Sequence, residues 1–258
     1  MTLRTDVSGG FSVRVWTAGS GSPLLYLHGL EGHPGDAPFL KRLAERHRVF
    51  APELPGYGES SGFELIDGIL GMALHHRQLV TSWGVGALDV IGHSLGGMLA
   101  AEFAAINPQL TRRLVLVDAY GLWMDDPQVP DPFVLNETEL KAKKWAHPEA
   151  AGIEPSIFVA DPANPGAAAL QRSKNLSVAT KFMWPIPDRG LRGRLGYVEA
   201  PTLVVHGTED RLMPVAYADE FARLIPDAKV ARIDDAGHLP MVECEDAFME
   251  AVEGFLAG

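Results

Sequence analysis

The stretch "ALDVIGHSLGGMLAAEFAAINP", residues 87–108, joins an apolar run to an alanine-rich run through a short polar triplet. Leu88 to Ile91 have the length and β-branched content of a buried strand, and from Leu95 the apolar residues recur at helical spacing. Ser94 therefore lies at a strand-to-helix corner within the pattern "GHSLG". Glycines on both sides of such a corner allow close backbone approach and turn the serine hydroxyl outward. The pattern predicts a nucleophile elbow.

The rest of the chain repeats the alternation of strand-like and helical patterns. Further apolar runs of strand length are "FSVRVWTAG", "PLLYLHG", "RVFAPEL", "RLVLVDA", "PTLVVHG" and "AKVARID". Helical patterns cover Pro38–Arg46, Asp67–Trp83, Ser94–Ile106, Val215–Leu224 and Val242–Leu256. Leu3–Val7 and Phe11–Thr17 flank two glycines and predict an antiparallel hairpin at the sheet edge. The alternation predicts an α/β fold, with a mostly parallel sheet and helices on both faces.

One long interruption divides this pattern. Residues 1–120 and 197–258 carry the α/β alternation, whereas residues 121–196 are rich in Pro, Asp and Ala. Shorter helical patterns occur in this inserted segment at Glu137–Trp145 and Ala167–Lys181. Because the segment follows one core strand and precedes the next, we expect it to stand above the strand ends as a helical cap or lid.

Composition limits the classes of function. The chain has 258 residues, 47% hydrophobic and 21% charged, with a formal net charge of −11. An acidic chain argues against nucleic acid or an anionic membrane as partner. No apolar leader or membrane-spanning run is present, so we expect a cytoplasmic protein. HExxH, P-loop and GxGxxG patterns are absent, so we expect no metal and no cofactor. The oligomeric state is left open.

The single cysteine, Cys244, allows no internal disulfide. It lies in "MVECEDAFMEAV", an acidic amphipathic pattern in which neighbouring carboxylates raise a thiol pKa. Ser94 is therefore the better candidate nucleophile.

A serine needs a base and an orienting acid to become nucleophilic. His238 lies in "IDDAGHLPMVE", a loop after the last strand, which suits a catalytic base. Asp210 lies in "PTLVVHGTEDRLMP", just past another strand end, and is the preferred acid. Asp118 ends "RLVLVDA" and stays open as the alternative acid.

The other histidines receive ordinary structural roles. We expect His206 to hydrogen-bond a loop and His93 to pack within the elbow. Polar or helical surroundings predict solvated positions for His47, His75, His76 and His147.

An oxyanion also needs hydrogen-bond donors. The strand in "YLHGLEGHPGD" ends at His28-Gly29, so the N–H of Leu30 can pair with the N–H of Leu95 at the start of the elbow helix. We expect His28, Gly29 and His93 to lie at the substrate pocket beside these amides.

Together the motifs "YLHGLEG", "APELPGYGES", "GHSLGG", "VVHGTEDRLMP" and "DDAGHLP" make the chain resemble the α/β-hydrolase superfamily over nearly its whole length. The resemblance implies Ser94 as nucleophile, His238 as base, Asp210 as orienting acid, and the amides of Leu30 and Leu95 as oxyanion hole. Residues 121–196 occupy the place of the family's helical cap.

Departures from branches of this family narrow the expected chemistry. Relatives that open epoxides or remove halide carry aspartate where this chain has Ser94. Carbon–carbon bond hydrolases of ring-fission products usually have tryptophan after the catalytic histidine and asparagine before the serine, where this chain has Leu239 and His93. Prolyl aminopeptidase relatives typically carry tryptophan where this chain has Leu95.

We therefore expect a carboxylesterase-like serine hydrolase that acts on small or medium carboxylic esters. Carbon–carbon, amide, thioester and lactone hydrolysis stay open as alternatives on the same triad. An alternative from another class is a ligand-binding receptor with slow turnover, because fold membership does not fix function.

The inserted segment contains large apolar residues that suit a substrate pocket or a small core of its own. These are Trp123, Phe133, Trp145, Phe158, Phe182, Met183 and Trp184. Trp184 lies in the proline-stiffened "KFMWPIPDRG", which leads back into the core, so we expect it to face the elbow and line an apolar pocket.

Overall fold

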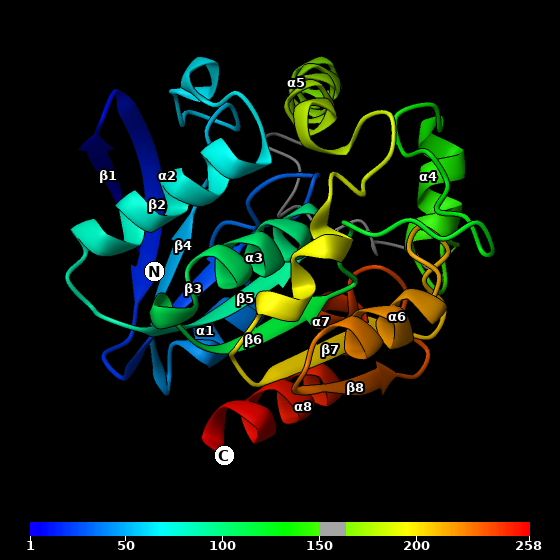
Figure 1. Cartoon of the computed structure of the whole chain (residues 1–258). Coiled ribbons are helices and arrows are strands. Elements are labelled where there is room, and N and C mark those ends of the chain that lie inside the picture. The colour runs from blue at the N-terminus through cyan, green and yellow to red at the C-terminus, as the bar shows by residue number, and fades with distance from the viewer. Residues whose placement is uncertain (150–163) are drawn as a thin grey trace.

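A computed structural model describes residues 1–149 and 164–258. Within them the chain forms an eight-stranded sheet in the order β1-β2-β4-β3-β5-β6-β7-β8 (Figure 1). The strands are β1 (Thr2–Ser8), β2 (Phe11–Ala18), β3 (Ser22–Leu27), β4 (His47–Pro52), β5 (Leu88–His93), β6 (Thr111–Val117), β7 (Thr202–Gly207) and β8 (Ala228–Ile233). β1 and β2 form the predicted antiparallel hairpin, β2 also pairs antiparallel with β4, and the other neighbours are parallel. The predicted α/β fold class is confirmed.

Helices cover both faces of this sheet. Those of the core are α1 (Pro38–Leu43), α2 (Ile69–Ser82), α3 (Leu95–Ile106), α6 (Ala216–Leu224), α7 (Pro240–Glu243) and α8 (Glu245–Ala257). Short 3₁₀ turns occur at Phe63–Leu65, Pro108–Leu110, Leu191–Gly193 and Leu195–Tyr197. The last helix was expected to be continuous, but the backbone of Cys244 is not helical and divides it into α7 and α8.

Alternate residues of the central strands enter two separate cores. In β3, Leu25 and Leu27 pack on the side of α2, α3 and α6, whereas Leu24 and Tyr26 pack on the side of α1 and α8. Burial on both faces explains why the parallel strands are almost continuously apolar in sequence.

Three histidines correct the expectation of solvated positions. His47, His75 and His76 are buried, whereas His147 is exposed as expected. His75 packs its ring 4.1 Å from the ring of Phe11, and burial lowers the pKa of His75 to about 4. An uncharged imidazole can pack like another aromatic ring, so polar neighbours in the sequence were a poor guide to exposure.

The inserted segment contributes α4 (Glu137–Lys144) and α5 (Pro165–Met183). In Figure 1, α5 lies at the top of the view and α4 lies at the right. Val178, Ala179, Phe182 and Met183 of α5 belong to the same buried cluster as core residues of α2 and α3. Phe158 lies outside the described residues.

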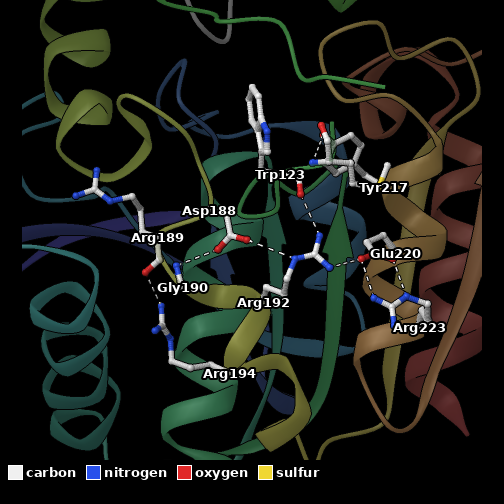
Figure 2. Close-up of polar contacts among 10 residues, drawn as sticks. Trp123, Asp188, Arg189, Gly190, Arg192, Arg194, Tyr217, Glu220 and Arg223 are labelled. Atoms are coloured by element: carbon white, nitrogen blue, oxygen red, sulfur yellow. Dashed lines mark hydrogen bonds and ion pairs between the residues drawn. The ribbon is translucent and has the colours of Figure 1, made fainter. Parts of the chain in front are cut away.

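Arginine contacts hold the two ends of the inserted segment on the core (Figure 2). The Arg192 guanidinium pairs with Glu220 of α6 and with Asp188, and it donates to the Trp123 carbonyl at 3.0 Å. The chain leaving the core at Trp123 and the chain returning at Asp188 are therefore held together.

A second pair ties the return of the chain to the elbow helix. Arg194 donates to both carboxylate oxygens of buried Glu102 on α3, at 2.7 and 2.6 Å. It also donates to the Arg189 carbonyl at 3.0 Å (Figure 2). The bidentate pair of Arg194 with Glu102 fixes orientation as well as distance.

Across the described residues, the helices lack the combination of length and apolarity needed to cross a membrane.

Candidate active site

The corner between β5 and α3 holds Ser94 in a backbone conformation that is rare for a non-glycine residue. Its φ is 58° and its ψ is −121°. A Cβ on Gly92 would lie 2.2 Å from the Gly96 carbonyl oxygen, and one on Gly96 would lie 2.1 Å from the Leu27 carbonyl oxygen. Only glycine fits at these two positions, so the close packing of the corner maintains the strained serine.

Three distant side chains meet above this corner. The Nε2 atom of His238 lies 2.9 Å from Ser94 Oγ, and its Nδ1 atom lies 2.7 Å from Asp210 Oδ2. They come from the ends of β5, β7 and β8, which share one edge of the sheet because these strands are parallel. All three residues are buried, with Ser94 only 1% exposed. A serine–histidine–carboxylate chain of this geometry can transfer a proton from the hydroxyl to the imidazole.

The carboxylate of Asp210 is held by the loop that carries it. Its Oδ1 accepts the N–H groups of Leu212 and Met213, at 2.8 and 3.0 Å, which leaves Oδ2 for His238. Burial would raise the pKa of Asp210, but the rings of His238 and His206 and the Met213 amide together hold it below its usual value. An ionised Asp210 keeps the Nδ1 proton of His238 in place and so leaves Nε2 to accept one.

The alternative acid, Asp118, lies beside Asp210 rather than against the His238 ring. Its φ is 44°, and its Oδ1 accepts the Gly207 N–H at 3.0 Å. Burial and the charge of Asp210 raise the pKa of Asp118 well above its usual value. Burial beside Asp210 therefore favours the protonated form of Asp118, as expected when two carboxyl groups share a buried site.

His206 bonds a loop, as expected, through Nε2 donating to the Met213 carbonyl at 2.7 Å. Among the described residues, Asp118, His206 and Asp210 form one group whose potential ligand atoms all lie within 4.8 Å of one another. His206 and Asp210 already use these atoms in hydrogen bonds within the protein. The group is thus tied into the hydrogen bonds of the loops around Asp210.

A tight turn after β3 contacts the elbow at Ser94. The Gly32 N–H donates to the Gly29 carbonyl at 3.2 Å, which closes the turn of residues 29–32, hereafter the oxyanion turn. A Cβ on Gly29 would lie 3.0 Å from Ser94 Cβ, so the turn contacts the elbow. The Leu30 N–H is not used in closing such a turn, and Leu95 is the first residue of α3, whose N–H has no acceptor within the helix. Both amides can therefore serve an oxyanion.

His28 and His93 both form hydrogen bonds to backbone groups of the loops near Ser94. His28 accepts the Leu54 N–H at Nε2 (2.9 Å) and donates from Nδ1 to the Gly29 carbonyl (2.8 Å). Burial lowers the pKa of His28 to about 4, so this neutral tautomer is maintained. His93 donates from Nε2 to the carbonyl of His238 at 2.7 Å, and burial lowers its pKa to about 3. Their predicted place in the substrate pocket stays a prediction.

Trp184 lies at the end of α5 and is 48% exposed. Its ring centroid lies 6.3 Å from that of Phe133, and this edge-to-face pair is formed within the inserted segment. Its predicted role in the pocket stays a prediction.

Sequence patterns missed the contacts between the end of α4 and the site. The Lys144 carbonyl accepts the His238 N–H at 2.7 Å, and the Lys143 carbonyl accepts the Arg211 N–H at 3.0 Å. Asn136 and Glu139 form a capping box that marks the start of this helix. The sequence at the C-terminal end of α4 has no local pattern that predicts which residues this end will contact.

Comparisons with known proteins agree with this architecture. The family described as "alpha/beta hydrolase fold" matches residues 22–243. Polyketide synthase ThaQ of Burkholderia thailandensis is 30% identical over 97% of this chain, which spans only 12% of that protein. Lipase 1 of Psychrobacter immobilis is 27% identical over 92% of this chain and 77% of its own length.

Another relative is 2-hydroxymuconate semialdehyde hydrolase of Pseudomonas putida, which is 26% identical over 98% of this chain and 94% of its own length. Among solved structures, a membrane phospholipase A described as a bacterial virulence factor has a TM-score of 0.85 at 24% identity. It covers 100% of this chain and 86% of its own. This structural likeness establishes the fold alone.

The raised pKa of Asp118 predicts a change in how stability depends on pH. Folding raises the pKa of Asp118 above that of an unfolded aspartate, near 4. Stability from this group is therefore fully present below that pH and is lost as the pH rises. An asparagine at this position cannot ionise, so Asp118→Asn does not lose this stability as the pH rises. The unfolding free energy of Asp118→Asn minus that of wild type should therefore increase between about pH 5 and 8.

Urea unfolding at several pH values measures this difference, with Asp219→Asn on the exposed side of α6 as the control. A difference that stays constant or declines as the pH rises would show that Asp118 is ionised.

Proposed function

This chain belongs to the α/β-hydrolase family, and on that premise we propose that it is a serine hydrolase. It cleaves carboxylic esters of small or medium size through an acyl-enzyme on Ser94. The observation that carries the proposal is the unbroken hydrogen-bond chain from Ser94 Oγ through His238 to Asp210.

The geometry supports the following sequence of steps. His238 Nε2 takes the Ser94 hydroxyl proton as Oγ attacks the carbonyl carbon of the ester. His238 then gives this proton to the departing alkoxide, which leaves as the alcohol. Water attacks the acyl-enzyme with His238 again as base, and the acid product and free Ser94 are released. Asp210 stays ionised throughout and stabilises the imidazolium.

The tetrahedral intermediates carry an oxyanion, for which we assign the N–H groups of Leu30 and Leu95. Leu95 is the first residue of α3, where the partial positive charge of a helix N-terminus adds to the hydrogen bond. Both residues are buried, and a low local dielectric strengthens such contacts.

We propose residues 121–196 as the cap of this site. Support comes from α5, whose Ala179 and Phe182 share a buried cluster with Leu30 and Leu95. A cap of this kind encloses an apolar pocket that selects the acyl or alcohol group by size, which favours small and medium esters over long-chain triglycerides. We therefore propose a small molecule as the substrate. We further propose that the protein is cytoplasmic and that it needs no cofactor.

Relatives support ester hydrolysis and keep carbon–carbon bond hydrolysis as the second candidate. Lipase 1 is a relative of the first kind and 2-hydroxymuconate semialdehyde hydrolase of the second. This chain has Leu239 after His238 and His93 before Ser94. His93 bonds the backbone of the His238 loop, so this nitrogen is not available to a substrate. Ester hydrolysis is therefore preferred over carbon–carbon cleavage, while amide, thioester and lactone hydrolysis stay alternatives on the same triad and a receptor with slow turnover is the alternative from another class.

Ser94→Ala should lower kcat for p-nitrophenyl esters by about 10⁴-fold or more, because triad members act as a unit. Asp210→Asn should cost on the order of 10⁴-fold by favouring the wrong imidazole tautomer. Steady-state kinetics with purified proteins measures both, with exposed Ser173→Ala on α5 as the matched control. Unchanged activity in Ser94→Ala would remove the serine from the mechanism, and slow wild-type turnover limited to one event per site would favour the receptor.

Trp184→Ala should change the preference among acyl lengths while leaving folding intact, because a half-exposed ring at a pocket wall selects by size. The measurement is kcat/KM for p-nitrophenyl esters of increasing acyl length, together with a ring-fission product as carbon–carbon substrate. Exposed Tyr197→Ala is the control. A decrease by the same factor at every length would make Trp184 a structural residue, and faster turnover of the ring-fission product would reverse the preferred chemistry.

A further inference from the structure

The residue that follows Leu30 in the oxyanion turn is bound by two side chains of the inserted segment. Asn175 of α5 donates from Nδ2 to the Glu31 carbonyl at 2.6 Å. Lys144, the last residue of α4, donates from Nζ to Glu31 Oε1 at 2.8 Å. Both Asn175 and Lys144 are buried, at 5% and 4% exposure.

We propose that Asn175 and Lys144 are positioning residues for the oxyanion hole, so that the inserted segment completes the catalytic geometry in addition to covering Ser94. The proposal rests on the proposed function, because it assigns a purpose to the Leu30 amide within that mechanism.

Contacts with the core fix the first half of the oxyanion turn. The Gly29 carbonyl belongs to the same peptide group as the Leu30 N–H, and it accepts hydrogen bonds from His28 Nδ1 and from the Gly32 N–H. The next carbonyl, that of Leu30, accepts a single side-chain hydrogen bond, from the Tyr57 hydroxyl at 3.2 Å. The plane of the Leu30 amide therefore also depends on what holds Glu31.

The second half of the turn fits Asn175 closely. Gly32 has a φ of 127°, and a Cβ there would lie 3.1 Å from Asn175 Nδ2. A side chain at this position would crowd the amide group that reaches the Glu31 carbonyl. Gln171, one turn earlier on α5, donates to Asn175 Oδ1 at 2.8 Å. This contact orients the amide so that Nδ2 faces the turn.

Lys144 connects the same turn to the loop of the catalytic histidine. Its side chain reaches Glu31, and its carbonyl accepts the His238 N–H at 2.7 Å. One residue at the end of α4 thus contacts the neighbour of an oxyanion donor and the backbone of the base. A displacement of this helix end would move both groups relative to Ser94, and a misplacement of about 1 Å can cost about 100-fold in rate.

If the role of Asn175 and Lys144 were purely structural, the same contacts would exist but would not affect how the oxyanion is stabilised. The chain offers a control, because Lys181 also links α5 to the core. Its Nζ donates to the carbonyls of Phe63 and Ile66, at 3.2 and 2.5 Å, and neither residue belongs to the oxyanion turn. Lys181→Met therefore loosens α5 from the core without removing a contact of Glu31.

The test compares Asn175→Asp and Glu31→Gln with wild type and Lys181→Met. Asn175→Asp replaces the donor with an acceptor that faces the Glu31 carbonyl, and Glu31→Gln removes the charge that pairs with Lys144. Each protein is assayed with an oxygen ester and the matching thionoester, whose sulfur is a weak acceptor and gains little from the oxyanion donors.

We expect kcat for the oxygen ester to fall about 10- to 100-fold in Asn175→Asp and Glu31→Gln with KM little changed. The preference for the oxygen ester over the thionoester should decline by a similar factor. Lys181→Met should keep the wild-type preference. The proposal would be overturned if Asn175→Asp and Glu31→Gln both kept the wild-type preference for the oxygen ester over the thionoester. It would also be overturned if Lys181→Met lost as much of this preference as they do.

A second measurement does not depend on activity. Hydrogen exchange of the amides in residues 29–33 should be faster in Asn175→Asp than in wild type and in Lys181→Met. If Asn175→Asp fails to fold, Asn175→Ala serves in both experiments. Exchange unaltered by either Asn175 variant would overturn the proposal. A wild-type protein that does not turn over esters would contradict the proposed function, while the exchange rates would still decide whether α4 and α5 hold the turn.

Discussion

Close packing at the corner between β5 and α3 is the constraint on which the rest of the site depends. The Ser94 N–H donates to the Val117 carbonyl at 2.9 Å, and the Ser94 carbonyl accepts the Tyr120 N–H at 3.1 Å, so the end of β6 and the segment after it hold the strained residue through both of its backbone polar groups. The glycines at 92 and 96 permit the approach of the neighbouring backbone. Because the corner is fixed, the loops that carry His238 and Asp210 and the oxyanion turn all pack around a rigid element.

Features with a local pattern could be predicted from the sequence. The elbow at Ser94, the hairpin of β1 and β2, and the alternation of strands and helices all follow from spacing and glycine placement. The meeting of Ser94, Asp210 and His238 was predictable for a topological reason, since each follows a parallel strand and these strand ends share one edge of the sheet.

Features made by distant contacts could not be predicted. His76 was expected in solvent because its sequence neighbours are polar, yet it lies on the inner side of α2. Asp118 has the sequence position of an acid, but burial and the charge of Asp210 beside it raise the pKa of Asp118. The contacts of Asn175 and Lys144 with Glu31 span more than a hundred residues, and no spacing rule relates them. Such contacts depend on how α4 and α5 pack on the core.

A nucleophilic Ser94, made reactive by His238 and Asp210, is the central claim. The most direct measurement is covalent labelling with a fluorophosphonate, followed by mass spectrometry of the digested protein. A phosphonylating reagent requires an activated serine beside an oxyanion hole and does not require knowledge of the natural substrate. We expect one adduct per chain, on the peptide that contains Ser94. Labelling of a different residue, or a native protein that resists the reagent, would contradict it.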